Sequence, residues 1–221
     1  MINTGDRSKS SKKTRQVPLP NSHFSSSSWI RRAKTTCDVF RSAKTAIPIP
    51  AHHPALFDAL IQATLDPLVR AIRYVPSATV AAEKVRLDAI VLQRDDGSFL
   101  LDVVPARRIC NPAEQQLTQI ALAELDFKHI VLTAEETRQE PRRTNARLVW
   151  SHRGNPIPIG LRLRILLTLA DEGPMPLGEL LKNIRSEVDP APAVMALACA
   201  DLLVLDLAFN PLGPRTITRS R

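Results

Sequence analysis

The chain has 221 residues, 44% of them apolar, and a formal net charge of +8. This composition can bury one core of moderate size or two small ones, which argues against a fibrous or wholly disordered protein. No run approaches the roughly 18 uninterrupted apolar residues of a membrane span, and the N-terminus lacks an apolar signal core, so we expect a cytoplasmic protein without membrane contact.

The cysteines and histidines show no pattern of a disulfide framework or a zinc site. Cys37, Cys110 and Cys199 are far apart, odd in number and lack a C-x-x-C pair. The adjacent His52 and His53 have no further ligand at a suitable spacing. We therefore expect reduced cysteines and a structural or surface role for the histidine pair.

Nearly all of the excess charge lies in residues 1–35. This segment holds eight Lys and Arg against one acid, a net charge of +7, whereas the remaining 186 residues hold 22 basic and 21 acidic side chains. Its Ser-rich, apolar-poor composition predicts a disordered basic tail. Such a tail could lie along DNA phosphates; the alternatives are a solubilising tail or an overcalled start site.

The next part, residues 36–153, is predicted to be an α/β domain. HPALFDALIQATL has helical spacing up to Asp66-Pro67 and is followed by a short extended passage. Two strands then flank the turn residues at 95–97, and a helix after Pro112 leads to a strand around Ile130. A right-handed crossover between parallel strands is expected for this order.

Residues 138–153 form a connector rich in arginine, and Pro156 and Pro158 indicate a boundary. Residues 154–221 then show three short helices followed by two extended pieces, a pattern typical of a winged helix-turn-helix. The third helix, APAVMALACADLL, carries no side chain suited to reading a base edge. The pattern therefore favours partner docking by this domain over sequence-specific reading.

Two acids on adjacent predicted strands, Asp88 and Asp102, could hold a divalent metal against a phosphodiester. Carboxylate oxygens suit Mg²⁺, whose bound waters can attack phosphorus. A lysine near the second acid normally assists that water. Two acids on adjacent strands also occur in surface β-hairpins that have no catalytic role.

The segment RLDAIVLQRDDGSFLLDVVPAR resembles the core of the PD-(D/E)xK nuclease superfamily, in particular the TnsA-like transposase endonucleases. LDPLVRAIRYVP and TRQEPRRTNARLVW are similar to flanking stretches of that family, so the resemblance spans roughly residues 50–150. It implies a restriction-endonuclease-like fold, a mixed sheet flanked by helices. It also implies that Asp88 and Asp102 are the two metal-binding acids and that the helix acid is Asp58.

The chain departs from this family at the catalytic lysine. Val104 stands two residues after Asp102, where the family has lysine, and Leu87 stands where proline is usual. Loss of a positive group that stabilises the charge developing in the transition state commonly lowers the rate a hundredfold or more. Lys84 is a candidate for a displaced lysine, because it shares a face with Asp88 if the strand is regular.

Arginines outside the acid site are candidates for phosphate contact, since guanidinium groups match phosphate geometry. Some lie in the connector and some in the terminal hairpin, where they would form a wing. These candidates are Arg142, Arg143, Arg147, Arg215 and Arg219.

Three hypotheses follow. The first is a DNA-associated protein of nuclease fold, catalytically impaired, that acts with a transposase or recombinase on mobile DNA. The second is an active Mg²⁺-dependent endonuclease that uses Asp88, Asp102, Asp58 and Lys84. The third is a transcription regulator that acts through its winged helix and basic tail.

Overall fold

The computed structural model describes Met1 and residues 39–80, 83–186 and 188–221. The expected tail, apart from Met1, and Cys37 lie outside the described residues. Thr36–Arg221 forms one compact unit. In chain order its elements are β1 (Val39–Phe40), β2 (Ile49–Pro50), α1 (Pro54–Leu65), β3 (Val69–Val80), β4 (Glu83–Arg94), β5 (Gly97–Val103), the 3-10 turn η1 (Val104–Ala106), α2 (Pro112–Glu124), β6 (Lys128–Leu132), α3 (Ala134–Thr137), α4 (Arg142–Ser151), α5 (Ile159–Glu172), β7 (Met175–Pro176), α6 (Leu177–Asn183), α7 (Ala191–Cys199), β8 (Leu203–Leu205) and β9 (Ile217–Ser220).

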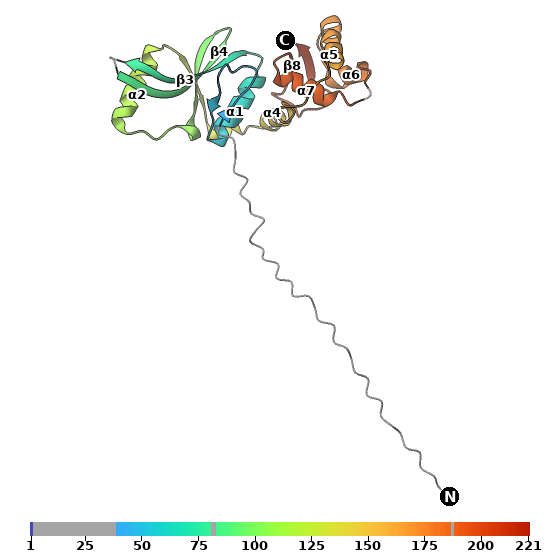
Figure 1. Cartoon of the computed structure of the whole chain (residues 1–221), viewed down its shortest axis with the longest axis horizontal. Coiled ribbons are helices and arrows are strands. Elements are labelled where there is room, and N and C mark those ends of the chain that lie inside the picture. The colour runs from blue at the N-terminus through green and yellow to red at the C-terminus, as the bar shows by residue number, and fades with distance from the viewer. Residues whose placement is uncertain (2–38, 81–82, 187) are drawn as a thin grey trace. The chain divides into compact units, whose positions relative to one another are not determined.

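A four-stranded mixed sheet in the order β3-β4-β5-β6 forms the centre of the N-terminal half. The β3–β4 and β4–β5 pairs are antiparallel, and β5 and β6 are parallel, joined through η1 and α2. Helices flank this sheet (Figure 1). The predicted mixed sheet and its parallel strand pair are therefore confirmed.

Helix α1 begins and ends as its sequence predicts. The Nδ1 atom of His53 accepts a hydrogen bond from the Ala55 N–H at 3.2 Å, and Pro54 occupies the first turn, where its missing N–H costs nothing. The helix stops before Asp66, whose backbone is extended because Pro67 follows it. His53 thus has the structural role expected of it.

The hairpin between β4 and β5 also follows the sequence. The turn at Asp95 and Asp96 leads into Gly97, whose φ of 133° is accessible mainly to glycine. The expected short extended passage after Pro67 is instead the 12-residue strand β3, so its length was underestimated. The connector of residues 138–153 is likewise not irregular, because most of it is helix α4.

The C-terminal part contains α5, α6 and α7 and a small sheet in the order β7-β9-β8. Both strand pairs in this sheet are antiparallel. The three helices and the two last strands agree with the sequence pattern. The two-residue strand β7 was not expected, since Met175–Pro176 is too short to show any periodicity.

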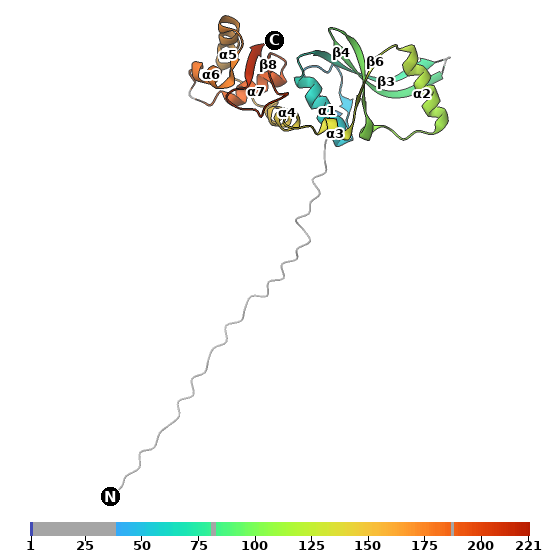
Figure 2. The same ribbon diagram turned by 180° about the vertical axis from the view of Figure 1, so that it is seen from behind.

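One hydrophobic core runs through both halves of the compact unit. Its buried side chains extend from Phe40 to Leu207, and Val85 of β4 and Ala121 of α2 form a second, small cluster. Phe40 stacks on Trp150 of α4 with 5.2 Å between ring centroids. Figure 2 shows the result: α2 and α5 lie toward opposite ends, with α1 and α4 between them.

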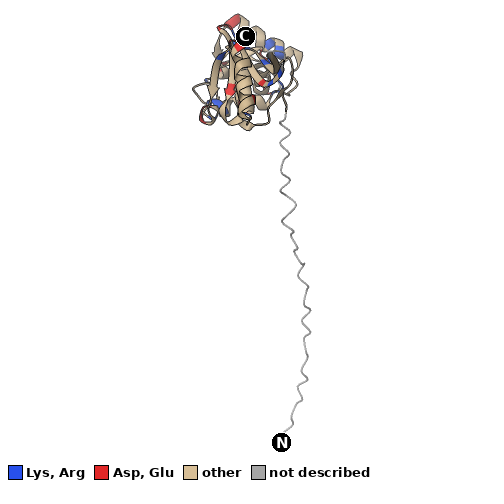
Figure 3. Ribbon diagram, turned by 90° about the vertical axis from the view of Figure 1, so that its left-hand side faces the viewer, with Lys and Arg blue, Asp and Glu red and all other residues tan. Residues whose placement is uncertain are grey.

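Acidic and basic residues are interspersed on the face of the described part seen in Figure 3. Local pairing therefore matters more than the overall charge in deciding which side chains are available to a polyanion. Within the ranges that the structure covers, no helix combines the length and apolar character needed to cross a membrane.

Candidate functional site

Asp88 lies in a β-bulge of β4, where two residues, Leu87 and Asp88, oppose one residue of β3. Its φ of 48° is in the left-handed region, which is uncommon for a residue other than glycine. The Tyr74 hydroxyl donates to Asp88 Oδ1 at 2.6 Å, and Arg86 Nε donates to Oδ2 at 2.6 Å. Both carboxylate oxygens are therefore already engaged within the chain.

The hydroxyl of Tyr74 is strongly affected by this position. Burial of the ring and, to a smaller extent, the hydrogen bond to Asp88 raise the pKa of Tyr74 to about 12. The neutral hydroxyl is thus the form that donates to the carboxylate at neutral pH. Tyr74 was not singled out from the sequence, although it is the single tyrosine of the chain.

Asp102 has an arginine of its own. Arg107 donates from Nε to Oδ1 at 2.9 Å and from Nη2 to Oδ2 at 2.5 Å, a two-bond arrangement that fits carboxylate geometry. The bonds raise the pKa of Arg107 above its usual value. Arg107 reaches Asp102 because η1 turns the chain after β5. The sequence does not predict that Arg107 pairs with Asp102, because a spacing of five residues across the end of a strand has no recognisable pattern.

The pleat of the sheet directs the two acids to different faces. Tyr74 pairs with Ile90, and Ile90 pairs with Leu101, so these three side chains share a face. The carboxylate of Asp88 lies on that face, because it accepts from the Tyr74 hydroxyl. Asp102 follows Leu101 and points to the opposite face. Asp88 near the middle of β4 thus lies close to the level of Asp102 near the end of β5, but the two side chains are directed to different faces.

The two positions considered for a catalytic lysine lie away from Asp88. Val104 is in η1, beyond the end of β5, and is partly exposed. Lys84 is exposed and pairs with Thr79 on the far side of the bulge. Its expected alignment with Asp88 required a regular strand, and the bulge interrupts that regularity. Arg86 is the cation that contacts Asp88.

Asp58, the candidate helix acid, is buried in the junction between α1 and α4. Its side chain is 4% exposed, Arg143 Nε lies 3.0 Å from Oδ2 and Arg147 Nε lies 2.7 Å from Oδ1. A buried carboxylate needs such partners to offset its lost hydration. Asp58 therefore joins two helices that are far apart in the sequence.

The five arginines considered for DNA contact divide into two groups. Arg143 and Arg147 are held by Asp58, and Arg142 lies 3.7 Å from Asp66. Arg215 and Arg219 are exposed, and among the described residues neither has a carboxylate partner. Arg215 and Arg219 of the terminal hairpin are thus more available for contact with DNA phosphates than the three arginines of α4.

The third helix of the C-terminal part, α7, is almost entirely buried. Its side chains pack into the core together with those of α4, and the Cys199 thiol donates to the Val149 carbonyl oxygen at 3.3 Å. Burial raises the pKa of Cys199 to about 12, so the thiol is neutral and unreactive. Since α7 is covered by its own chain, it cannot lie in a DNA groove in this arrangement.

The loop between β8 and β9 is held by Asn145 of α4. The buried Asn145 side chain donates to the carbonyl oxygens of Leu207 and Asn210 at 3.0 and 2.7 Å, and its Oδ1 accepts from the Leu212 N–H at 2.8 Å. Three bonds from one amide fix the path of the loop. In the sequence Asn145 was notable only through the family-like stretch around it.

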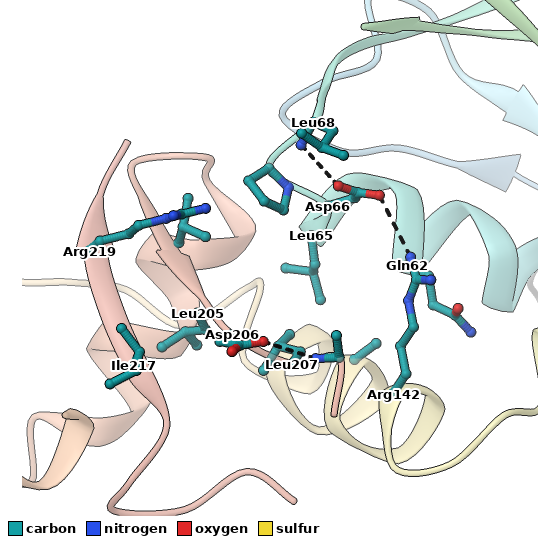
Figure 4. Close-up of a pocket in the computed structure, with 14 residues that line it drawn as sticks. Gln62, Leu65, Asp66, Leu68, Arg142, Leu205, Asp206, Leu207, Ile217 and Arg219 are labelled. Carbon is teal, nitrogen blue, oxygen red and sulfur yellow. Dashed lines mark hydrogen bonds and ion pairs between the residues drawn. The ribbon is translucent and has the colours of Figure 1, made fainter. Parts of the chain in front are cut away.

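A pocket of about 460 Å³ lies where α1, α4 and the β8–β9 region meet. Its walls are mainly apolar, and Arg142 and Arg219 approach it from different elements (Figure 4). Asp66 accepts from the Leu68 N–H at 2.9 Å and faces Arg142. The charges in the pocket are balanced, so it does not resemble a phosphate site.

In the part of the chain that the structure describes, no three His, Cys, Asp or Glu side chains are grouped so that they could hold a metal ion. No model of a known protein family matches the chain, and neither does any curated protein. The site must therefore be interpreted from its own geometry.

Proposed function

We propose that this chain is a non-cleaving protein of nuclease-like fold that associates with DNA and acts as a subunit beside a transposase or recombinase. One observation carries the proposal: Asp88 and Asp102 are each bound by an arginine and lie on opposite faces of the sheet. A metal shared by the two acids would require both ion pairs to break and one side chain to cross the sheet.

The order of elements supports the fold part of this proposal. A helix, three antiparallel strands, a crossover helix and a parallel strand are compatible with a restriction-endonuclease-like core. A fold alone does not assign a function, since one fold hosts many activities. The TnsA-like resemblance supplies the expected context, a partner enzyme on mobile DNA in the cytoplasm.

The C-terminal part supports DNA association of a limited kind. Its order of helix, strand, two helices and two strands fits a winged helix. Because α7 is buried, DNA contact in this proposal comes from the wing, through Arg215 and Arg219, and from the basic segment 1–35. Such contacts are made to phosphates and favour affinity over sequence specificity.

The salt dependence of binding to a fluorescent DNA duplex tests this assignment. Each lost phosphate contact lowers the slope of log affinity against log salt by about 0.9, so Arg215→Ala with Arg219→Ala should lower it by about 2. Arg70→Ala with Arg108→Ala is the matched control, because these exposed arginines are paired with acids. An unchanged slope in the first variant contradicts a DNA-contacting wing, and absence of binding by the wild type contradicts the proposal.

The transcription-regulator hypothesis makes a different forecast for the same assay. It requires strong preference for one DNA sequence, lost on removal of residues 156–221. Equal affinity for unrelated duplexes of one length supports the phosphate-binding proposal. A preference of a thousandfold or more for one site, roughly the lower end for specific regulators, contradicts it.

A further inference from the structure

Strand β8 lies at an edge of the C-terminal sheet, whose strand order is β7-β9-β8. Along an antiparallel pair, the N–H and C=O groups of successive residues point alternately toward the neighbouring strand and away from it. The Asp206 N–H donates to the Ile217 carbonyl oxygen at 3.0 Å, so the backbone of Asp206 and of Val204 faces β9. The N–H and C=O of Leu205, which lies between them, therefore point away from β9 to the open edge.

Two other hydrogen bonds agree with this direction. The Leu177 N–H donates to the Thr216 carbonyl oxygen at 2.7 Å, so Thr216 and, two residues later, Thr218 face β7. Thr218 is the register partner of Leu205 and therefore does not use its backbone groups. On the open side, the Leu207 carbonyl oxygen accepts from a side-chain amide of α4 at 3.0 Å. Among the described residues, the N–H and C=O of Leu205 thus have no partner within the chain.

The pocket of about 460 Å³ lies along this open edge. Leu205 and its neighbours form one wall, and Leu65 and Leu68, at the end of α1 and just beyond it, form another. Figure 4 shows Leu65 pointing from α1 into the pocket. Leu68 and Ile217 also line it and are 54% and 43% exposed. The pocket thus combines unpaired backbone groups with apolar side chains that the chain itself leaves partly uncovered.

The charged side chains around the pocket do not select its occupant. Asp66 lies 3.7 Å from Arg142, and Asp206 accepts from the Ala208 N–H at 3.3 Å. Arg219 belongs to β9, so a strand added beside β8 lies one strand away from it. Two acids and two arginines leave the lining without a net charge. Backbone hydrogen bonding and apolar contact are therefore the chemistry that the pocket offers to a ligand.

We propose that the open edge of β8 binds an extended segment of another protein, which adds a strand to the order β7-β9-β8. One residue of the segment lies opposite Leu205, donates to its C=O and accepts from its N–H, while an apolar side chain contacts Leu65. Leu205 is 4% exposed, and unpaired backbone groups beside a buried side chain are costly, so this edge gains stability from a partner strand. The proposal uses neither Arg215 nor Arg219 and does not rest on the proposed DNA contacts.

Hydrogen exchange of the full chain, followed residue by residue by NMR, tests whether the edge is open. The N–H groups of Val204 and Asp206 face β9 and should exchange slowly. The Leu205 N–H should exchange at least about tenfold faster, because it has no partner in the free protein. Equal protection of the three N–H groups overturns the proposal.

A phage-displayed library of short random peptides, selected against the full chain, tests binding. Enriched peptides should share a large apolar residue and, once synthesised, should slow exchange of the Leu205 N–H. Leu68→Arg should weaken the selected peptide's affinity by at least about tenfold, because Leu68 lines the pocket. Leu148→Arg is the matched control, since Leu148 is 46% exposed and lies on α4 outside the pocket. Failure to enrich any peptide, or equal affinity of the two variants, overturns the proposal.

N-methylation of the selected peptide tests pairing as a strand. A methyl group on a main-chain nitrogen removes a donor and prevents close approach to β8. Because alternate residues of a strand face its neighbour, methylation at every second position should weaken binding by at least about tenfold. Methylation at the positions between them is the control and should change the affinity much less. Equal losses in the two peptides, as expected for a helical or irregular ligand, contradict an added strand.

Discussion

The α1–α4 junction and the acid pair of the sheet use the same chemistry with different consequences. In the junction, one buried carboxylate, Asp58, serves two arginines. On the sheet, Asp88 and Asp102 each have one arginine, and these pairs are more exposed. Burial makes the first arrangement indispensable to the fold, while water can replace much of the second. An acid–arginine pattern therefore does not by itself distinguish a structural centre from a functional one.

The largest effect should come from removing the acid of the junction. Asp58→Ala leaves Arg143 and Arg147 without their carboxylate and should reduce the free energy of unfolding by about 2–4 kcal/mol, somewhat below the value for fully buried pairs because both arginines reach solvent. Urea denaturation measures this loss. Asp95→Ala, which breaks the exposed pair with Arg70, should change stability much less. Equal losses in the two variants would remove the distinction between the regions.

A similar but smaller effect is expected at Asn145, which holds the β8–β9 loop. Asn145→Ala removes three hydrogen bonds of a buried amide, leaves the buried Leu207 carbonyl unsatisfied and should cost about 2–3 kcal/mol. Hydrogen exchange of residues 207–212 should accelerate more than exchange elsewhere. Asn155→Ala, at an exposed asparagine, is the control. Unchanged exchange in the loop would show that Asn145 does not fix its path.

Replacing Asp88 of the sheet should change the pKa of Tyr74 more than it changes the free energy of unfolding. The pKa of Tyr74, about 12 in the folded protein, exceeds its ordinary value of 10, so its contribution to stability is complete below pH 10 and is lost as the pH rises toward 12. Asp88→Asn should lower this pKa while leaving it above 10, because burial is the larger cause. Ultraviolet absorbance of the single tyrosine follows the titration directly. An identical titration in the variant would mean that Asp88 does not face the hydroxyl.

The sequence predicted those elements whose signals are local. Helix α1 and the β4–β5 hairpin were found because Pro67 and Gly97 mark their ends within a few residues of the pattern they terminate. Strand β3 was underestimated because Pro76 interrupts its run. The sequence indicates a connector where helix α4 forms, because the five arginines of residues 138–153 outnumber the buried apolar residues Ala146, Val149 and Trp150.

The geometry of the candidate site could not be predicted in the same way. The bulge at Asp88 depends on the register of β3 and β4, and the partners of Asp58 lie 85 and 89 residues further along the chain. The face that Asp102 occupies depends on the register of β4 and β5. Residue types therefore identify the acids as candidates, but contacts between distant parts of the chain decide whether their side chains lie close together.

Nicking of supercoiled DNA in the presence of Mg²⁺ or Mn²⁺ tests the central claim most directly, using the wild type, Asp88→Ala and Val104→Lys. We expect no metal-dependent nicking by any of them, because restoring a lysine at residue 104 does not bring Asp102 to the face of Asp88. Val104 is partly exposed, so the variant should remain folded, with stability within about 0.5 kcal/mol of the wild type. Nicking by the wild type that is lost in Asp88→Ala would contradict the account and establish an active endonuclease.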